Sequence, residues 1–363
     1  MSDTRSTSPP VPSAGVIVRR ALDLGHLLRM SDGIGILEHA EFARPRPEHG
    51  YCTDDNARLC VLAHELSASN SGGDEHRRRI LGRLASIGLR FALDAQEPSG
   101  EVRNRRGLGG GWTDDPAVND SWGRAVHAYG IARSGARSAW ERRSAGIAFD
   151  RASRHRTHHL RSMAFAALGA AAVIETDPGN RGALDLLADT ADLVWSARTT
   201  SDWPWPEDRL TYANAVIPEA LIAAAAALDR DDELIDALEL LEWLIDVESS
   251  PGHLSVTPAG GRGPGDPAPD FDQQPLEVAA IVAACRRAAL HDTPDRWSAR
   301  RQVAAEWFLG RNDRGQVMID PISGGGYDGL TADGANRNQG AESTMAMLTA
   351  VNALASAPSR GRP

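Results

Sequence analysis

The chain of 363 residues is long enough for one large domain or two ordinary ones, and its 42% hydrophobic and 24% charged residues are typical of globular proteins. A net charge of −10 argues against nucleic acid or an anionic membrane as the main partner. All 39 basic residues are arginine, which excludes Schiff-base aldolases, lysine-anchored pyridoxal enzymes and phosphate loops of the GxxxxGK[ST] type.

The cysteines and the apolar segments indicate a cytoplasmic protein with one domain. Cys52, Cys60 and Cys285 are an odd set without a CxxC spacing, so they predict neither a disulfide framework nor a zinc knuckle and fit a reducing cytoplasm. No apolar segment has the length of a signal-peptide core or a membrane span. We expect residues 15–356 to form a single domain between disordered tails at 1–14 and 357–363.

Helical periodicity dominates the chain, and alternating β-branched runs are nearly absent. Stop signals such as Asp177-Pro178-Gly179 and Ser250-Pro251-Gly252 mark several helix ends. The periodicity predicts twelve helices, at 15–30, 54–69, 75–95, 118–134, 138–155, 158–175, 180–198, 214–229, 231–248, 274–290, 294–309 and 339–356.

The connections between these helices alternate in length and chemistry. Connections after the odd-numbered helices are mostly long and rich in carboxylates, amides and aromatics, whereas those after the even-numbered helices are short. In one exception, the fifth and sixth helices are expected to meet with almost no loop near 155–157. Antiparallel helix pairs with this parity place the long loops on one face. We therefore predict an all-α (α/α)6 toroid of six helical hairpins, with the alanine-rich even helices inside; an open superhelical array is the alternative.

The first long loop, HGYCTDDNAR, contributes Tyr51, Asp54, Asp55 and Arg58 as candidate site residues. Paired carboxylates suit acid–base chemistry, but aspartates at a helix start also suit a capping role, because free N–H groups and the helix dipole favour them there. Arg58 lies one turn after Asp54 and belongs either to the site or to a structural ion pair.

The next two long loops add tryptophans and further carboxylates. In GWTDDPAVNDSWGR the candidates are Trp112, Asp120, Trp122 and Arg124. In DWPWPEDRLTYAN they are Trp203, Trp205, Glu207, Asp208, Tyr212 and Asn214. Tryptophan rings stack on pyranose faces, with a place in the core as the alternative. Asp120 and Arg124, four residues apart, either bind substrate or pair with each other.

Two later segments carry amides beside a carboxylate. Gln274 of DFDQQPLE either recognises hydroxyls or caps a helix. Asn338, Gln339 and Glu342 converge at the start of the last helix, in NRNQGAEST. Histidines without HExxH-type spacing and a GLGGG run with no preceding strand lead us to expect no metal and no cofactor.

The strings HGYCTDDNAR, DSWGRAVHAYG, DWPWPEDRLTYANAVIPEAL and NRNQGAESTMAML together resemble a bacterial family of six-hairpin, glycosidase-like toroids, whose members are described as glycosyltransferases or glycosidases. The resemblance spans about residues 31–348. It implies an (α/α)6 barrel with a carbohydrate cleft. The signature positions that it implies are Asp54, Asp55, Arg58, Asp120, Arg124, Glu207, Asp208, Asn338, Gln339 and Glu342. Trp122 stands where the family has a smaller or imidazole side chain, and the nucleotide-sugar-binding halves of a true glycosyltransferase are absent.

Paired carboxylates with aromatic platforms are what glycoside cleavage requires, so we predict a glycoside hydrolase or phosphorylase that acts on oligosaccharides, with inversion. Glu207 is the expected general acid and Asp55 the base, and Glu342 is the substitute for either. If inorganic phosphate is the acceptor, Arg58, Arg124 or Arg337 would bind it.

Two alternatives stay open. The first is a sugar epimerase or isomerase that uses His49 or His127 as acid or base. The second is a noncatalytic glycan-binding partner of a glycosyltransferase. The sequence leaves the oligomeric state open.

Overall fold

The computed structural model of the chain describes residues 13–69, 74–197 and 202–355. Within these ranges the chain forms thirteen α-helices: α1 (Ala14–Leu22), α2 (Gly25–Met30), α3 (Thr53–Ser69), α4 (Glu75–Ala95), α5 (Asp120–Gly135), α6 (Ala139–Ala152), α7 (Leu160–Ile174), α8 (Arg181–Ala197), α9 (Val216–Ala227), α10 (Asp231–Val247), α11 (Pro275–Ala288), α12 (Pro294–Glu306) and α13 (Ala341–Ala355). The expected tails lie outside the described residues, except for Ser13 and for Ala14, which already begins α1.

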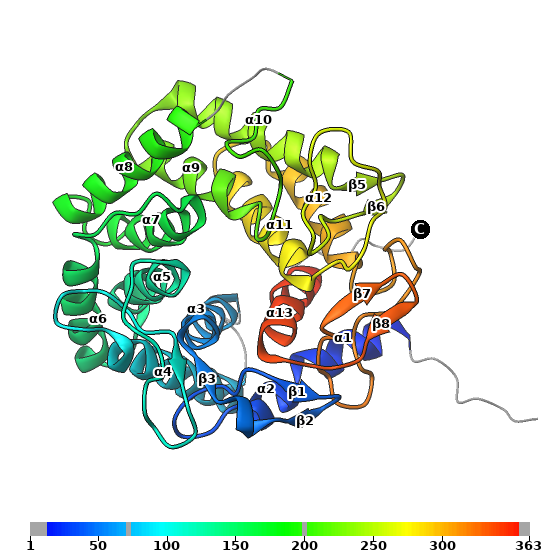
Figure 1. Cartoon of the computed structure of the whole chain (residues 1–363), viewed down its shortest axis with the longest axis horizontal. Coiled ribbons are helices and arrows are strands. Elements are labelled where there is room, and N and C mark those ends of the chain that lie inside the picture. The colour runs from blue at the N-terminus through cyan, green and yellow to red at the C-terminus, as the bar shows by residue number, and fades with distance from the viewer. Residues whose placement is uncertain (1–12, 70–73, 198–201, 356–363) are drawn as a thin grey trace, which may run out of the picture.

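The helices form a closed ring of two layers (Figure 1). Helices α3, α5, α7, α9, α11 and α13 surround the axis, each packs against the next, and α13 packs against α3 to close the ring. The other helices form the outer layer. A helix with neighbours on every side is apolar all round, and fourteen consecutive residues of α7, Leu160–Val173, are indeed buried. The predicted toroid, with the alanine-rich helices inside, is confirmed.

The first predicted helix is in fact two. Leu24 has a left-handed backbone (φ 60°), which ends α1, and α2 starts at Gly25. L-residues rarely adopt this conformation and no helix continues through it. If α1 and α2 are counted as one bent helix, the twelve predicted helices are all present.

The expected near-absence of a loop around 155–157 is wrong. α6 ends at Ala152 and α7 begins at Leu160, so residues 153–159 form a link. His155 Nε2 lies 2.8 Å from the carbonyl oxygen of Ser99, and Arg156 pairs with Asp189 at 2.6 Å. These polar contacts fix residues 153–159 in a non-helical conformation, although their composition is similar to that of a helix end.

Four two-stranded antiparallel sheets, which the sequence did not predict, lie in the long loops. They are β1 (Ala40–Glu41) with β2 (Arg44–Pro45), β3 (Tyr51–Cys52) with β4 (Arg105–Arg106), β5 (Ser249–Ser250) with β6 (His253–Leu254), and β7 (Gly329–Thr331) with β8 (Gly334–Asn336). A short 3-10 helix, Pro47–His49, precedes β3. Pairing of β3 with β4 brings the loop after α4 against the start of α3.

Helices α5 and α7 approach closely because glycines face each other. A Cβ atom on Gly130 would collide with the carbonyl oxygen of Gly169, and one on Gly169 would collide with that of Val126. Only glycine fits such a contact. None of the helices in the described ranges combines the length and apolarity needed to cross a membrane.

We expect Gly130→Ala to lower the free energy of unfolding by about 3 kcal/mol, because the added methyl overpacks the contact between α5 and α7. Gly82→Ala is the matched control: Gly82 also lies inside a helix, but a Cβ there meets no atom within 4 Å. That change should raise stability by up to about 1 kcal/mol through helix propensity. Urea unfolding measures both, and equal effects would contradict the packing argument.

Candidate active site

The candidate site lies where the inner helices begin. Asp54 and Asp55 are in the first turn of α3, Asp120 in that of α5, and Glu342 in that of α13. The positive end of a helix dipole favours carboxylates at this position. Two cavities of about 450 and 380 Å³ open there, and Asp54 borders both. We call this end of the barrel the mouth.

One arginine joins two carboxylates from opposite ends of the chain. Arg58 Nη1 lies 2.6 Å from Asp55 Oδ1, and Arg58 Nη2 lies 2.5 Å from Glu342 Oε2. Asp55 is 3% exposed, whereas the Glu342 side chain is 40% exposed. The two acids therefore share Arg58 as their counter-ion. Asp55 contacts it from a buried position, and Glu342 contacts it from the open cavity.

Asp55 has a proton affinity suited to acid–base chemistry. Burial raises the pKa of its carboxyl group to about 6, against the opposing charge of Arg58, and the nearby Glu342 raises it further. The Cys52 thiol donates a hydrogen bond to Asp55 Oδ2 at 3.2 Å. A carboxyl group that titrates near neutrality can either give or accept a proton under ordinary conditions.

Asp54 lies at the boundary between the two cavities. Asn104 Nδ2 donates to its Oδ2 at 2.9 Å, and its backbone N–H donates to Asn104 Oδ1 at 3.3 Å. Its other oxygen, Oδ1, is buried without a hydrogen bond in the described structure, and Arg124 Nε is 3.7 Å away. Asp54 Oδ1 is thus a buried acceptor that no described group satisfies with a hydrogen bond.

Asp120 and Tyr212 meet on the other side of the mouth. Ser162 Oγ donates to Asp120 Oδ1 at 2.7 Å, and the Tyr212 hydroxyl donates to Asp120 Oδ2 at 2.5 Å. Asp120 does not pair with Arg124 in the described structure, so the i,i+4 ion pair considered for them is not formed. Tyr212 is 39% exposed, and Arg161 lies over its ring at 4.8 Å.

Glu207 is fully engaged by protein groups. The buried Arg161 places Nη1 2.7 Å from both Glu207 oxygens, and Trp205 Nε1 lies 3.3 Å from Oε2. Arg161 also donates to Asn214 Oδ1 at 2.9 Å. These contacts hold the carboxylate of Glu207 through both oxygens, so the geometry suits positioning of Arg161 better than contact with a substrate.

Behind Arg161 lies a buried carboxylate pair. Glu277 accepts hydrogen bonds from the backbone N–H of Asn214 and from Asn214 Nδ2, both at 3.1 Å, and from the backbone N–H of Ala213. Glu248 accepts from the same Asn214 amide group at 3.4 Å and from Thr257. Burial and then the neighbouring Glu248 raise the pKa of Glu277 well above its usual range. Asn214 is therefore a buried structural link and not a surface contact.

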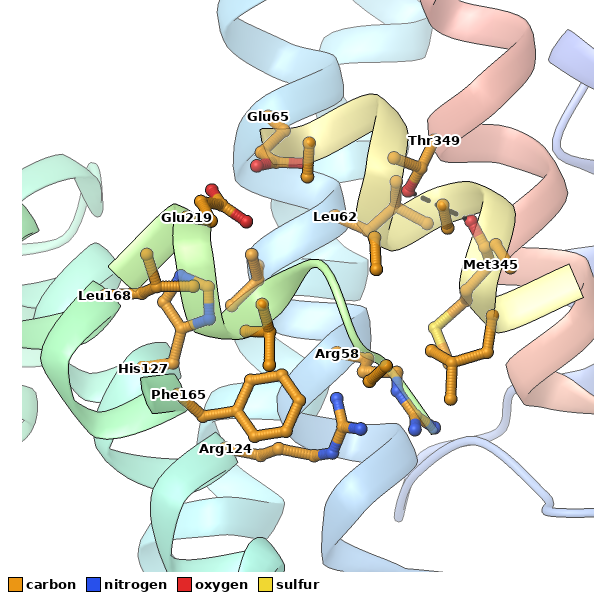
Figure 2. A pocket seen from close by; sticks show the side chains of 18 of the residues that line it. Arg58, Leu62, Glu65, Arg124, His127, Phe165, Leu168, Glu219, Met345 and Thr349 are labelled. Atoms are coloured by element: carbon orange, nitrogen blue, oxygen red, sulfur yellow. Dashed lines mark hydrogen bonds between the residues drawn. The ribbon is translucent and has the colours of Figure 1, made fainter. Parts of the chain in front are cut away.

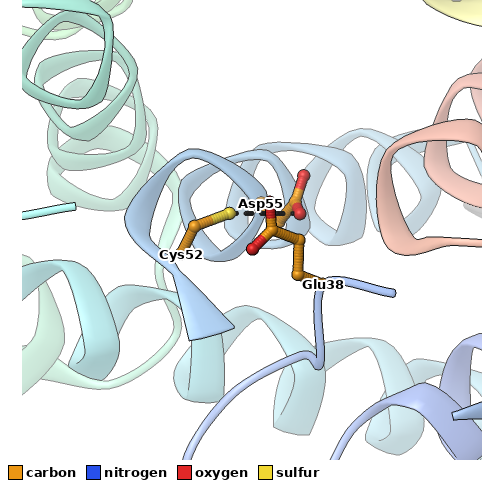
Figure 3. Close-up of side chains that lie close together, drawn as sticks. All are labelled: Glu38, Cys52 and Asp55. Carbon is orange, nitrogen blue, oxygen red and sulfur yellow. Dashed lines mark hydrogen bonds between the residues drawn. The ribbon is translucent and has the colours of Figure 1, made fainter. Parts of the chain in front are cut away.

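Glu38, Cys52 and Asp55 place one potential metal-ligand atom each within 4.8 Å of one another (Figure 3). Their surroundings do not fit a cation. Arg105 already pairs with Glu38, and Arg58 with Asp55. Burial raises the pKa of the Cys52 thiol, which donates to Asp55 as the protonated form.

The tryptophan predictions need correction. Trp122 and Trp205 are completely buried, so their rings belong to the core and cannot stack on a sugar in this structure. Trp203 is half-buried and packs edge-on against Trp243, on which Trp205 stacks. Trp112 packs on Phe91 under Arg106 and lies outside both mouth cavities. Trp243, which contacts the rings of both Trp203 and Trp205, belongs to α10.

The remaining candidates divide between mouth and scaffold. Gln274 lines the cavity that holds Asp55 and Glu342. Tyr51 is buried and donates to Asp32 at 2.6 Å, and Gln339 is buried between Asp320 and Ser323. Asn338 Oδ1 accepts from the backbone N–H of Phe42 at 2.9 Å. Asp208 is exposed and borders neither cavity.

Several lining residues were missed by the sequence reasoning. They are Glu38, His39, Asn104, Arg105, Asn119, His159, Arg161, Ser162 and Asp328. Asn104 and Arg105 reach the mouth through the pairing of β3 with β4. Arg161 is the most informative omission, because a single arginine in the first turn of an otherwise apolar inner helix needs a buried acidic partner.

We expect the Glu277 network to make stability depend on pH. The folded-state pKa of Glu277 is raised, so folding binds a proton, and the stability from that proton is lost as pH rises above the usual range of glutamate. The pKa of Glu277 rises from 4.5 to about 8 on folding, so the melting temperature should fall between those two pH values and level off above them, and Glu277→Gln should flatten this fall. Differential scanning calorimetry of the exposed-acid variant Glu239→Gln gives the control slope. A slope unchanged in Glu277→Gln would refute the assignment.

No established protein family matches the chain, and no curated sequence does either. Solved structures do match. A sugar epimerase from a ruminal bacterium has a TM-score of 0.69 at 12% identity, over 94% of this chain and 98% of that one. A D-mannose isomerase has a TM-score of 0.68 at 12% identity, over 97% and 100%. The α-1,6-mannanase GH76A of a Salegentibacter species has a TM-score of 0.62 at 11% identity, over 94% and 98%. The chain thus has the (α/α)6 toroid fold of these proteins.

Proposed function

We propose that this protein is a carbohydrate-active enzyme that cleaves glycosidic bonds at the mouth, as a hydrolase or phosphorylase. The observation that carries the proposal is the Asp55–Arg58–Glu342 bridge beside an open cavity. Because two nitrogens of one guanidinium contact the acids, their nearest oxygens lie within roughly 7 Å of each other. That span suits two carboxyl groups acting on one glycosidic linkage.

The environments of the two acids suggest their roles. Asp55, anchored by Arg58 and Cys52, accepts the proton of the attacking water as that oxygen bonds to the anomeric carbon. Glu342 engages Arg58 only through Oε2 and faces the cavity, and it gives a proton to the leaving oxygen as the old bond breaks. Glu342 takes the role that was expected of Glu207, because Arg161 holds both oxygens of Glu207 whereas Arg58 contacts a single oxygen of Glu342. Asp54 and Asp120 bind hydroxyls.

The comparisons support sugar chemistry on this scaffold. The names of these similar structures are those of enzymes that act on sugars. One further structure is an inactive variant of the α-1,6-mannanase in which two adjacent aspartates are replaced by alanine. This chain carries an adjacent aspartate pair, Asp54 and Asp55, at its own mouth.

Asp55→Asn and Glu342→Gln should each lower kcat/KM by roughly 10³-fold, the usual contribution of a positioned acid or base. The assay is release of nitrophenol from a panel of nitrophenyl glycosides, with and without inorganic phosphate. Glu306→Gln removes another arginine-paired glutamate, outside the mouth, and should leave the rate unchanged. Unaltered rates in Asp55→Asn, with circular dichroism showing a native fold, would sink the proposal.

The pH profile tests the role of Asp55 separately. As the base, Asp55 must be ionised, so kcat/KM should fall as pH drops through about 6, with a slope of one proton. A rate that instead falls above pH 6 would show that Asp55 acts as the acid. Proton NMR of the first-formed anomer tests the expected inversion.

A second candidate is a sugar epimerase or isomerase. It is favoured by the higher TM-scores of the epimerase and the isomerase, and by His127, which lines the cavity on the barrel axis. Epimerisation through a carbanion exchanges a carbon-bound proton with solvent. Deuterium incorporation into free sugars in heavy water, abolished by His127→Asn and retained in Glu342→Gln, would establish this reaction instead.

A further inference from the structure

Below the mouth, a cavity of about 160 Å³ lies on the barrel axis and is lined by all six inner helices (Figure 2). It adjoins the mouth, because the paired side chains of Arg58 and Glu342 border both spaces. Its wall is mainly aliphatic and aromatic: Val61, Leu62, Ile131, Phe165, Leu168, Val216, Leu276 and Met345. Such a wall offers few hydrogen bonds to sugar hydroxyls. It resembles the apolar cavities of roughly 150 Å³ that take up benzene.

The charges in this wall are almost all paired. Arg58 contacts Glu342, Arg286 contacts Glu65, and Arg287 lies 3.5 Å from Glu219. Arg124 is the fourth arginine of the wall, and the wall holds no fourth acid for it.

Arg124 is buried without a hydrogen-bonded partner. Its side chain is 8% exposed, lies over the Phe165 ring at 3.8 Å, and donates no hydrogen bond within the described residues; Asp54 is its one ion contact, at 3.7 Å. Figure 2 shows its guanidinium beside that of Arg58, at one end of the cavity. The nitrogens of Arg124 are not sealed from solvent, so a ligand acceptor can replace water on donors that no described protein group uses.

His127 is also available to a ligand. It lies one turn after Arg124, lines the same cavity, and makes no hydrogen bond within the described ranges. Burial, and then Arg287, Arg124 and Arg286, lower the pKa of His127 to about 3. It is therefore neutral at ordinary pH and adds a polar contact without a charge.

We propose that the axial cavity binds an apolar group of about the size of a benzene ring that carries one oxyanion, with the oxyanion on Arg124 and the ring among Phe165, Leu168 and Met345. Its further role, which rests on the proposed function, is to hold the aglycone of the glycoside that is cleaved at the mouth. A carboxylate suits Arg124 through paired N–H donors. Inorganic phosphate lacks an apolar body for the remaining wall.

Calorimetry with benzoate, benzyl alcohol and inorganic phosphate tests the binding without any turnover. Wild-type protein should bind benzoate at least tenfold more tightly than benzyl alcohol. Arg124→Gln should weaken benzoate binding at least tenfold and leave benzyl alcohol unchanged, and Leu168→Trp should abolish the binding of both by filling the cavity. Arg143→Gln, which removes an exposed arginine of α6, is the charge control and should bind like wild type.

Three results overturn the binding proposal: equal affinity for benzoate and benzyl alcohol, benzoate binding that Arg124→Gln leaves intact, or phosphate binding at Arg124 more tightly than benzoate. Benzoate binding should persist in Asp55→Asn. The calorimetric test of the cavity therefore does not depend on whether the proposed catalysis is correct.

The aglycone role is tested by comparing 4-carboxyphenyl with 4-methylphenyl glycosides. Wild type should favour the carboxylate by at least tenfold in kcat/KM, and Arg124→Gln should remove that preference. Benzoate binding without such a preference overturns the aglycone role alone. If neither glycoside is cleaved, the proposed function fails, and the calorimetry still tests whether the axial cavity binds an aromatic carboxylate.

Discussion

Closure of the ring is the constraint on which this structure depends. α13 packs against both α11 and α3, so the last helix of the described residues lies beside the first inner one. Only then does Glu342 reach Arg58, which also pairs with Asp55. An open array of the same hairpins would leave α3 and α13 far apart and Arg58 with a single acid. The pairing of Arg58 with two acids thus requires the ring to be closed.

Apart from histidine, every basic side chain in this acidic protein is an arginine. The buried ion pairs show why the choice of arginine matters. Arg161 serves Glu207, Asn214 and the backbone oxygen of Tyr212 at once. A lysine ammonium has no comparable planar fork. Desolvating these charges is expensive, and it is offset only where each nitrogen has a partner. The contacts of Arg161 meet that condition and fix residues 207–214 against the barrel, whereas Arg58 and Arg262 each keep a buried nitrogen without a hydrogen bond in the described structure.

Much of the architecture was predictable, since long apolar helices carry a strong periodic signal and the alternation of long and short connections specifies which helices lie inside. Strands of two or three residues carry no such signal, so the small sheets were missed. Trp122 and Trp205 were misassigned because a tryptophan in a loop-to-helix motif suits core and surface equally. Arg161 escaped notice because its partners, Glu207 and Asn214, lie 46 and 53 positions away.

The position of Glu342 at the start of the final helix has a consequence for biosynthesis. A nascent chain emerging from the ribosome holds Asp55 and Arg58 early, but their carboxylate counterpart comes from α13, at the opposite end of the described chain. Until α13 docks, the barrel lacks one wall and Arg58 lacks one of its acids. Translation products that stop before α13 would consequently lack both the closed ring and the contact of Arg58 with Glu342.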